Sequence, residues 1–239
     1  MDVPSNSIEN FINEQLVRWK ETKAKRDKNL EAHKPVITIS SEPGSGGESQ
    51  LAPGLARKLE FDLFKRDIIK EISDSAHISA KIMETIGKDR LADVSEHITK
   101  VIADRFLWPD LYLEHLMKVI GIIGKHGNAV IVGRGVNFII PPEERLSIRI
   151  VAPLNIRVQN TARALKMQHS DAQRRVLNHE SERRAFIRKS FNADASNPNN
   201  YDLVINTQGM NIESSINAIS DFWTSDYNLK NKTWLPDGK

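Results

Sequence analysis

The chain has 239 residues, of which 39% are hydrophobic and 27% charged, which suits one α/β domain with an appendage. Its 34 basic and 31 acidic residues leave a formal charge of +3, too small a surplus to indicate nucleic-acid binding. The lack of cysteine excludes disulfides, thiolate nucleophiles and cysteine-based zinc sites. No apolar run approaches the roughly 18 residues of a membrane span, and the polar N-terminus is unlike a secretory signal. We therefore expect a cytoplasmic protein that binds neither nucleic acid nor a membrane.

Residues 1–33 are expected to form a helical extension. Its apolar residues recur at helical spacing, at Ile8, Phe11, Ile12, Leu16 and Trp19. A strongly charged stretch follows at 20–28. Two interpretations are open. The helix can fold against the domain, because its apolar stripe ends early, or it can serve as an arm through which the protein forms homo-oligomers.

A β-branched stretch at 33–40 predicts the first strand, and it runs into the glycine-rich loop Gly44-Ser45-Gly46-Gly47. A helix is expected to follow from Ser49 to Leu59. Backbone N–H groups of such a loop, together with the N-terminus of a helix, can hold a phosphate. The usual lysine is missing, because Gly47 stands in its place and Glu48 stands where serine or threonine is usual. The alternative is that the glycines make only a tight turn.

Strands and helices alternate along the remainder of the chain. Further strands are expected at 61–64, 129–132, 146–151 and 201–207. Helices are expected at 68–76, 155–169, 170–191 and 212–222, with a mostly helical region at 78–124 broken at Trp108-Pro109-Asp110. This alternation predicts a three-layer α/β fold around a mostly parallel sheet of about five strands. Such sheets bind ligands at the carboxyl ends of their strands.

Four short blocks in this order resemble the cytidylate kinase-like family of P-loop nucleotide kinases. The blocks are Ile39–Gly47, Lys65–Ile69, Ala129–Gly135 and Tyr201–Thr207. The resemblance spans roughly 36–223 and implies an adenylate-kinase-like fold. A kinase-like domain would cover 34–224, with a helical acceptor-binding segment and a mobile lid, and a polar tail would cover 225–239. Members of this branch often show Gly-Ser-Gly-Gly where cytidylate kinases proper show Gly-Ser-Gly-Lys.

The resemblance implies that the glycine loop holds ATP with Mg²⁺. The candidate donor-binding residues are Gly44, Ser45, Gly46, Gly47, Glu48 and Ser49. Ser49 aligns with the threonine that follows the lysine of cytidylate kinases, and it is the candidate for positioning Mg²⁺. The carboxylate of Glu48 would repel a triphosphate unless Mg²⁺ lies between them.

Arginines late in the chain are candidates for the catalytic positive charge that the loop lacks. Arg183, Arg184 and Arg188 resemble the lid segment of the family, whose arginines close over the phosphates. Arg184 and Arg188 are four residues apart and share a helix face, whereas Arg183 is one residue off it. The alternative is a solvated basic helix paired with Glu180 and Glu182.

Three residues are candidates for binding the acceptor substrate. Arg134, which follows Gly133 at the end of a strand, resembles the arginine that contacts the acceptor phosphate, and its alternative is a surface turn. The family's aspartate after this arginine is Gly135 here, so specificity for cytosine is not implied. Asp67 can either bind the acceptor or cap the helix that begins at Ile68.

Two further expectations concern other residues. Arg157 is expected either to open the lid helix or to be an ordinary first-turn surface charge. The aromatic residues Phe106, Trp108 and Tyr112 are expected either to pack inside the helical segment or to stack on an acceptor base.

Two functions follow from these residues. The first is phosphoryl transfer from ATP–Mg²⁺ to a nucleoside monophosphate or a similar small acceptor. The second is a non-catalytic nucleotide sensor on the same fold, in which the altered loop binds but does not transfer. A purely structural domain is a third interpretation and is less favoured, because several loops suited to anions would then have to occur together by accident. Of the first two, the enzyme is the leading interpretation and the sensor stays open.

Overall fold

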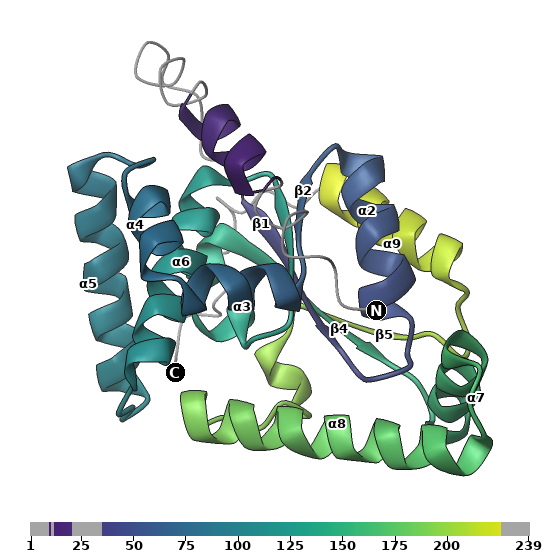
Figure 1. Cartoon of the computed structure of the whole chain (residues 1–239). Helices are drawn as coiled ribbons and strands as arrows, with labels where there is room; N and C mark the ends of the chain where they lie inside the picture. Colours follow the sequence, from purple (N-terminus) through teal and green to yellow (C-terminus); the bar gives the residue numbers. More distant parts are fainter. Residues whose placement is uncertain (1–9, 11, 21–34, 226–239) are drawn as a thin grey trace, which may run out of the picture.

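The computed structural model describes residues 10, 12–20 and 35–225. One sheet of five strands, all parallel, runs through its centre in the order β2-β3-β1-β4-β5 (Figure 1). The strands are β1 (Val36–Ser41), β2 (Asp62–Phe64), β3 (Ala129–Val132), β4 (Arg145–Val151) and β5 (Leu203–Asn206). β1, β3 and β4 are rich in Val and Ile, as expected for parallel strands covered on both faces. The predicted α/β fold with a parallel five-stranded sheet is confirmed.

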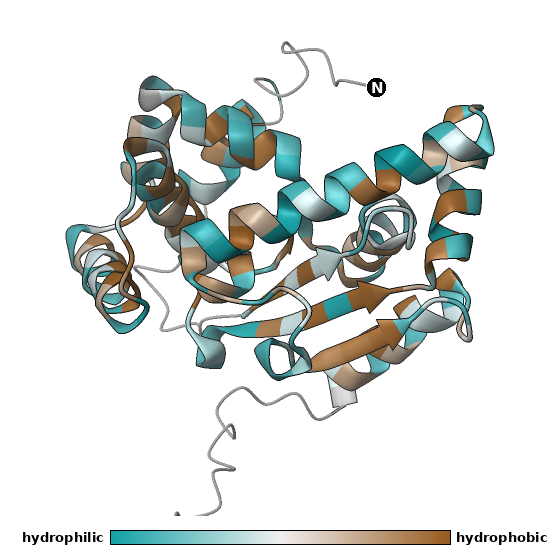
Figure 2. Ribbon diagram, turned by 90° about the horizontal axis from the view of Figure 1, so that it is seen from below, coloured by the Kyte–Doolittle hydropathy of each residue, from teal (hydrophilic) through white to brown (hydrophobic). Residues whose placement is uncertain are grey.

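Helices cover both faces of this sheet (Figure 1). One face packs against α2 (Ala52–Leu59) and α9 (Ile212–Ser225), which share a core with the apolar residues of β1 and β4. The other face packs against a helical segment, which consists of α3 (Arg66–Asp74), α4 (Ala76–Met83), α5 (Lys88–Asp104) and α6 (Leu111–His126). Figure 2 shows the central strands as mainly hydrophobic and the helix surfaces as mixed. Among the described residues, no helix is long and apolar enough to cross a membrane.

Two helices connect β4 to β5 and lie over the ends of the strands. They are α7 (Leu154–Leu165) and the 23-residue α8 (His169–Phe191). In Figure 1, α8 runs along the lower side of the molecule, below the carboxyl ends of the strands. This position makes α7 and α8 the lid of the region where a parallel sheet binds its ligands.

The predicted break in the helical region is confirmed. α5 ends at Asp104, and α6 begins at Leu111, where the Asp110 carboxylate accepts a hydrogen bond of 2.8 Å from the Leu113 N–H. The connection between them turns outward, so Phe106 is 82% exposed and Trp108 is 96% exposed. The expected packing of these two side chains inside the helical segment is therefore wrong, and stacking on an acceptor base stays a prediction.

The N-terminal helix is described for residues 12–20, and it folds back onto the domain. Ile12, Leu16 and Trp19 are buried, and the Trp19 ring stacks on the His126 imidazole with centroids 4.2 Å apart. This supports a helix that packs on its own domain, because the apolar stripe is covered within the chain. Ile8, Phe11, the charged stretch after residue 20 and nearly all of the predicted polar tail lie outside the described residues.

Candidate functional site

The glycine loop joins β1 to a short π-helical turn, Gly47–Leu51, that leads into α2. Gly44 and Gly46 adopt φ values of 82° and 83°, a left-handed conformation that favours glycine. In the described part of the chain, the N–H groups of Gly46, Gly47, Glu48 and Ser49 meet no protein acceptor. Unpaired donors at the start of a helix are the arrangement that binds phosphate oxygens.

Ser45 shapes this loop from inside. Its buried hydroxyl donates to the Glu42 carbonyl at 2.8 Å and lies 2.9 Å from Ser41 Oγ, while Thr207 Oγ1 donates to the Ser45 carbonyl at 2.9 Å. Gly47 is equally internal, because a Cβ there would lie 2.4 Å from Ser41 Oγ. The side chain of Ser45 is thus committed to the loop, and a ligand would meet mainly backbone and the side chains of Glu48 and Ser49.

Helix α7 lies directly against the loop. Asn160 Nδ2 donates to the Gly44 carbonyl at 3.0 Å. A Cβ on Gly44 would lie only 2.3 Å from the Arg157 carbonyl oxygen, so this close approach requires glycine. The lid and the glycine loop are therefore in contact in this structure.

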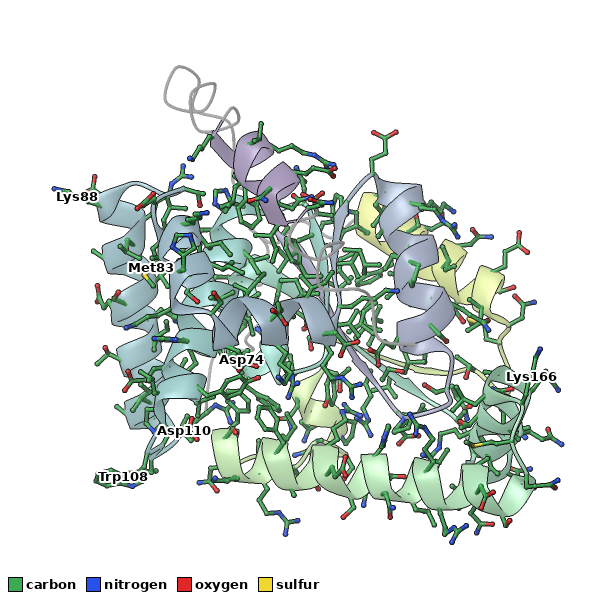
Figure 3. The ribbon with its side chains drawn as sticks, in the orientation of Figure 1. Asp74, Met83, Lys88, Trp108, Asp110 and Lys166 are labelled. Carbon is green, nitrogen blue, oxygen red and sulfur yellow. The ribbon has the colours of Figure 1, made fainter. Side chains whose placement is uncertain are left out.

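A cavity of about 890 Å³ lies between the loop, the turn after β3, α7 and α8. Its volume is in the upper part of the range of about 300–1000 Å³ for small-molecule sites. The cationic side chains that line it are Arg66, Arg134, Arg163, Arg175 and Arg183, and the carboxylates are Glu42, Glu48 and Glu182. Figure 3 shows nitrogen-bearing side chains gathered between the sheet and α8. The cavity is thus suited to a polyanion.

Most of the predicted site residues line this cavity. They are Gly44, Ser45, Gly46, Glu48, Ser49, Gly133, Arg134 and Arg183. Gly47, Asp67, Arg184 and Arg188 do not line it. The convergence expected from the parallel topology is therefore present for the loop, for the turn after β3 and for one arginine of α8.

A buried ionic network lies behind the loop. Arg149 Nη2 lies 3.0 Å from Glu42 Oε1, and Arg157 Nε lies 3.4 Å from Glu42 Oε2. Arg157 Nη1 also pairs with Glu180 Oε2 at 2.9 Å, and Arg157 Nε donates to the Ala152 carbonyl at 2.9 Å. The expectation of a first-turn surface charge at Arg157 is therefore wrong, because two carboxylates and a carbonyl hold its guanidinium inside. Arg157 links the loop to α8 through this network.

Arg183 reaches the end of β1 from α8. Its Nη1 donates to the Ser41 carbonyl at 2.8 Å, and its Nη2 donates to Ser40 Oγ. Burial, reinforced by the positive charge of Arg149, lowers the pKa of Arg183 to about 10. The group still carries its charge at neutral pH, and within the described residues no carboxylate forms an ion pair with it. A bound anion would supply the missing partner.

Arg184 and Arg188 share a face of α8, as their spacing predicts, but this face is not the one that lines the cavity. Both lie beside Leu177 and Ser181 on the other side of the helix, and Arg184 pairs with Glu180 at 2.6 Å. The rotation of about 100° per residue separates them from Arg183. The positions of these two arginines therefore agree with the alternative interpretation, a solvated basic helix paired with Glu180.

The turn after β3 consists of Gly133, Arg134 and Gly135, with successive φ values of 81°, 52° and 69°. A non-glycine residue with positive φ is strained, so Arg134 is held in an unusual position. Its guanidinium lies 5.7 Å from the centroid of the Phe186 ring, and its buried Nε has no hydrogen-bond partner within the described residues. Arg134 thus lines the cavity, and its Nε–H has no acceptor within the described residues.

Gly135→Ala is expected to lower the free energy of unfolding by about 2 kcal/mol. The backbone there has φ of 69°, and an added Cβ would lie 2.2 Å from Phe191 Cε2. The aspartate of cytidylate kinases proper therefore does not fit at this position without moving Phe191. Chemical denaturation would measure the loss. Gly209→Ala, where no atom lies within 4 Å of the new Cβ, is the control and should change stability little. Equal effects of the two variants would contradict the explanation.

Asp67 lies apart from the cavity. The N-cap of α3 is Lys65, so Asp67 is the second residue of the helix, and its carboxylate lies 3.6 Å from Arg66 Nε at the surface. The capping prediction is wrong, because the helix begins two residues earlier than Ile68. The negative charge of Asp67 in the first turn of α3 can still stabilise the helix by its interaction with the positive end of the helix dipole. Its neighbour Arg66, which lies in the same block Lys65–Ile69, lines the cavity.

Glu42 and Arg149 were also missed by sequence reasoning. Both carry a signal that could have found them: a charged residue within or directly after a β-branched strand. A charge at such a buried position needs a partner. The cavity-lining arginines of α7 and α8, Arg163 and Arg175, carry no such signal, because their helices are polar on most sides.

The sheet order, the glycine loop at the end of β1 and the lid over it define a P-loop kinase-like α/β protein. The chain belongs to the cytidylate kinase-like family, whose sequence profile matches residues 36–209. It is 25% identical over 184 residues to a cytidylate kinase from Ignicoccus hospitalis, a match that covers 77% of this chain and 96% of that one. It is 26% identical over 188 residues to a cytidylate kinase from Pyrobaculum islandicum, with 78% and 91% covered.

The fold is also similar to that of a solved structure. A crystal structure of an uncharacterized protein from Eubacterium ventriosum superposes with a TM-score of 0.63 at 16% sequence identity, covering 81% of this chain and 99% of that one. At this identity the likeness concerns the fold.

Proposed function

We propose that this protein transfers a phosphoryl group from ATP–Mg²⁺ to a nucleoside monophosphate or a similar small acceptor. The observation that carries the proposal is the position of Arg183. Its guanidinium lies at the end of β1, beside a phosphate-binding loop that has no lysine. Phosphoryl transfer needs a cation close to the transferring group, and Arg183 meets this need from the lid.

The donor nucleotide would bind at the glycine loop. The free N–H groups of Gly46 to Ser49 fit the oxygens of a polyphosphate. Mg²⁺ takes oxygen ligands from one or two side chains and from substrate phosphates, and the oxygens of Glu48 and Ser49 on the cavity wall suit that pattern. The metal would neutralise charge on the phosphates when bound. It would also make Glu48 a favourable neighbour of the donor.

The acceptor would bind toward Arg134 and Arg66, which line the cavity from the turn after β3 and from the start of α3. An oxygen of the acceptor would form a bond to the terminal phosphorus of the donor. The bond from that phosphorus to the bridging oxygen would break, leaving ADP. The phosphate of a nucleoside monophosphate is mainly a dianion at neutral pH, so its attacking oxygen has no proton to release. Arg183 would stabilise the negative charge on the transferring group.

The sensor interpretation uses the same loop without transfer. It predicts that no cation reaches the phosphates, because the loop has lost its own. The contact between Arg183 and the residues before the loop favours the kinase over the sensor.

The first test is calorimetric titration with ATP–Mg²⁺, followed by a coupled assay of ADP release. Cytidine, uridine, adenosine and guanosine monophosphates would be the acceptors. Acceptor-dependent release above the ATPase background would support the kinase. Tight ATP binding without release on any acceptor would favour the sensor, and no binding would mean that the loop is only a turn.

Arg134→Ala is expected to lower kcat/KM for the acceptor by about 10²-fold, because it removes a charge-assisted contact to the acceptor phosphate. The KM for ATP should change little, since the donor lies at the loop. Steady-state kinetics with each substrate varied in turn would measure both constants. Equal losses for donor and acceptor would contradict the assignment of Arg134 to the acceptor.

A further inference from the structure

A chain of two hydroxyl groups lies behind the guanidinium of Arg183. Ser40, near the end of β1, and Tyr201, which precedes β5, both line the cavity, and their hydroxyl oxygens lie 3.0 Å apart. The Tyr201 hydroxyl donates to the Ala195 carbonyl at 2.8 Å, in the segment between α8 and β5. Ser40 Oγ accepts from Arg183 Nη2. The chain therefore connects Arg183 on α8 to β1 and to the segment that precedes β5.

The direction of each hydrogen bond in this chain follows from the number of hydrogens. Tyr201 has one hydroxyl hydrogen and donates it to the Ala195 carbonyl, so the bond between Tyr201 and Ser40 uses the hydrogen of Ser40. The lone pairs of Ser40 Oγ are then left for guanidinium groups. It accepts from Arg183 Nη2 and, at 3.4 Å, from Arg149 Nη1. Tyr201 thus fixes the rotation of the Ser40 hydroxyl and makes it an acceptor for both arginines.

Of these two guanidiniums, that of Arg183 is the one that can meet a ligand. Arg149 pairs with the Glu42 carboxylate at 3.0 Å, is 4% exposed and does not line the cavity. Arg183 lines the cavity and, within the described residues, donates only to Ser40 Oγ and to the Ser41 carbonyl. A guanidinium has five N–H groups, so three of those of Arg183 meet no acceptor in this part of the chain. They are available to phosphate oxygens.

We infer that Ser40 and Tyr201 are positioning residues for phosphoryl transfer, because their hydroxyls hold the Arg183 guanidinium against the end of β1. The inference rests on the proposed function, and both residues act through Arg183 and not on the substrate. A charge stabilises a transition state best when it is already in place before the reaction. An arginine held from behind also loses less side-chain freedom when the substrate binds. The alternative is that the two hydroxyls only stabilise the fold.

Ser40→Ala and Tyr201→Phe test the inference, alone and combined with Arg183→Ala. Ser40→Ala removes an acceptor of Arg183, whereas Tyr201→Phe removes the hydroxyl that orients it and keeps the ring, whose centroid lies 5.6 Å from the Arg149 guanidinium. Each single variant should lower kcat about tenfold, the effect of one hydrogen bond to a charged group, and should raise the KM for ATP less than about threefold.

The double variants separate positioning from general stability. In the Arg183→Ala background, Ser40→Ala and Tyr201→Phe should each change kcat by less than about twofold, because the group through which they act is gone. Losses that multiply in the double variants, or single variants with the kcat of the wild type, would overturn the inference. Tyr201→Phe provides this test even if Ser40→Ala fails to fold, since it alters one oxygen only.

Ser79→Ala is the matched control. Ser79 lies in α4, is 1% exposed and donates to the Ile72 carbonyl at 2.7 Å, and it does not line the cavity. The variant should lower the Tm, as Ser40→Ala does, because both remove a buried hydrogen bond, but its kcat should stay within about twofold of the wild type. An equal fall in kcat for Ser79→Ala would mean that lost stability, and not the position of Arg183, causes the effect.

Calorimetry with inorganic pyrophosphate gives a second measurement, which needs no turnover. Ser40→Ala should weaken pyrophosphate binding about threefold, and it should have no effect when residue 183 is alanine. If no acceptor supports ADP release, the proposed function fails, but this dependence on Arg183 would still support the inference. In that case no loss, an equal loss with and without Arg183, or a wild type that binds no pyrophosphate would overturn it.

Discussion

Arg183→Ala is expected to lower kcat for phosphoryl transfer by about 10³-fold, the magnitude seen when a preorganised charge on a transferring phosphoryl group is removed. The glycine loop has no lysine, so it contains no cationic side chain that could replace Arg183. Binding of ATP–Mg²⁺ should weaken much less, because the backbone N–H groups of the loop are untouched. Single-turnover kinetics together with calorimetry would separate the two effects.

Control variants on the other face of α8 test whether kcat depends on the position of Arg183 or only on the total positive charge of the helix. Lys189→Ala removes a positive charge from an exposed position and should leave kcat within about twofold of the wild type. Arg184→Ala and Arg188→Ala should likewise have small effects. A loss at either arginine as large as at Arg183 would contradict the geometry that we assign to the site.

Glu42→Gln is expected to lower the free energy of unfolding by about 3 kcal/mol. The Glu42 carboxylate faces Arg149 and Arg157, whose side chains are only 5% and 8% exposed. Without it, two buried guanidiniums lose their shared counter-ion, and the segment before the loop loses its ionic contacts with β4 and α7. For a domain of this size the Tm should fall by about 6–12 °C. Thermal and chemical unfolding without ligand would measure the loss.

Glu96→Gln, on the exposed surface of α5, removes the same charge where no buried partner depends on it. Its effect should stay within about 0.5 kcal/mol. Similar losses for the two variants would mean that net charge, and not the buried network, sets the stability. ATP binding by Glu42→Gln should also weaken, because the Glu42 carboxylate, which accepts from the Ala152 N–H and pairs with Arg149, holds the segment just before the loop.

Much of the fold was predictable from local patterns. Strands β1, β3 and β4 are rich in Val and Ile, and such segments between helical stretches indicate a parallel sheet that is buried on both faces. The glycine loop was predictable because residues at the ends of parallel strands share one edge of the sheet. The same reasoning placed Arg134 beside the loop. These predictions depend on periodicity and topology, which the sequence carries directly.

Other features required the packed structure. One interpretation of Arg157 placed it at the surface, but Glu42 and Glu180 come from distant parts of the chain and hold it inside. One interpretation of Asp67 made it a helix cap, yet α3 begins one residue before it. One interpretation of Phe106 and Trp108 packed them inside the helical segment, and the turn between α5 and α6 carries them outward.

The sequence by itself determined the α/β fold, the position of the glycine loop after the first strand and the absence of a lysine from that loop. Only the tertiary structure decided which arginine of α8 reaches the end of β1. Arg183, Arg184 and Arg188 are alike in charge and lie on one helix, so their chemistry does not separate them. The rotation of α8 about its axis does, because buried Ile187 and Phe191 fix which side of the helix faces the domain. That rotation depends on contacts with residues far away in the chain, which no local pattern contains.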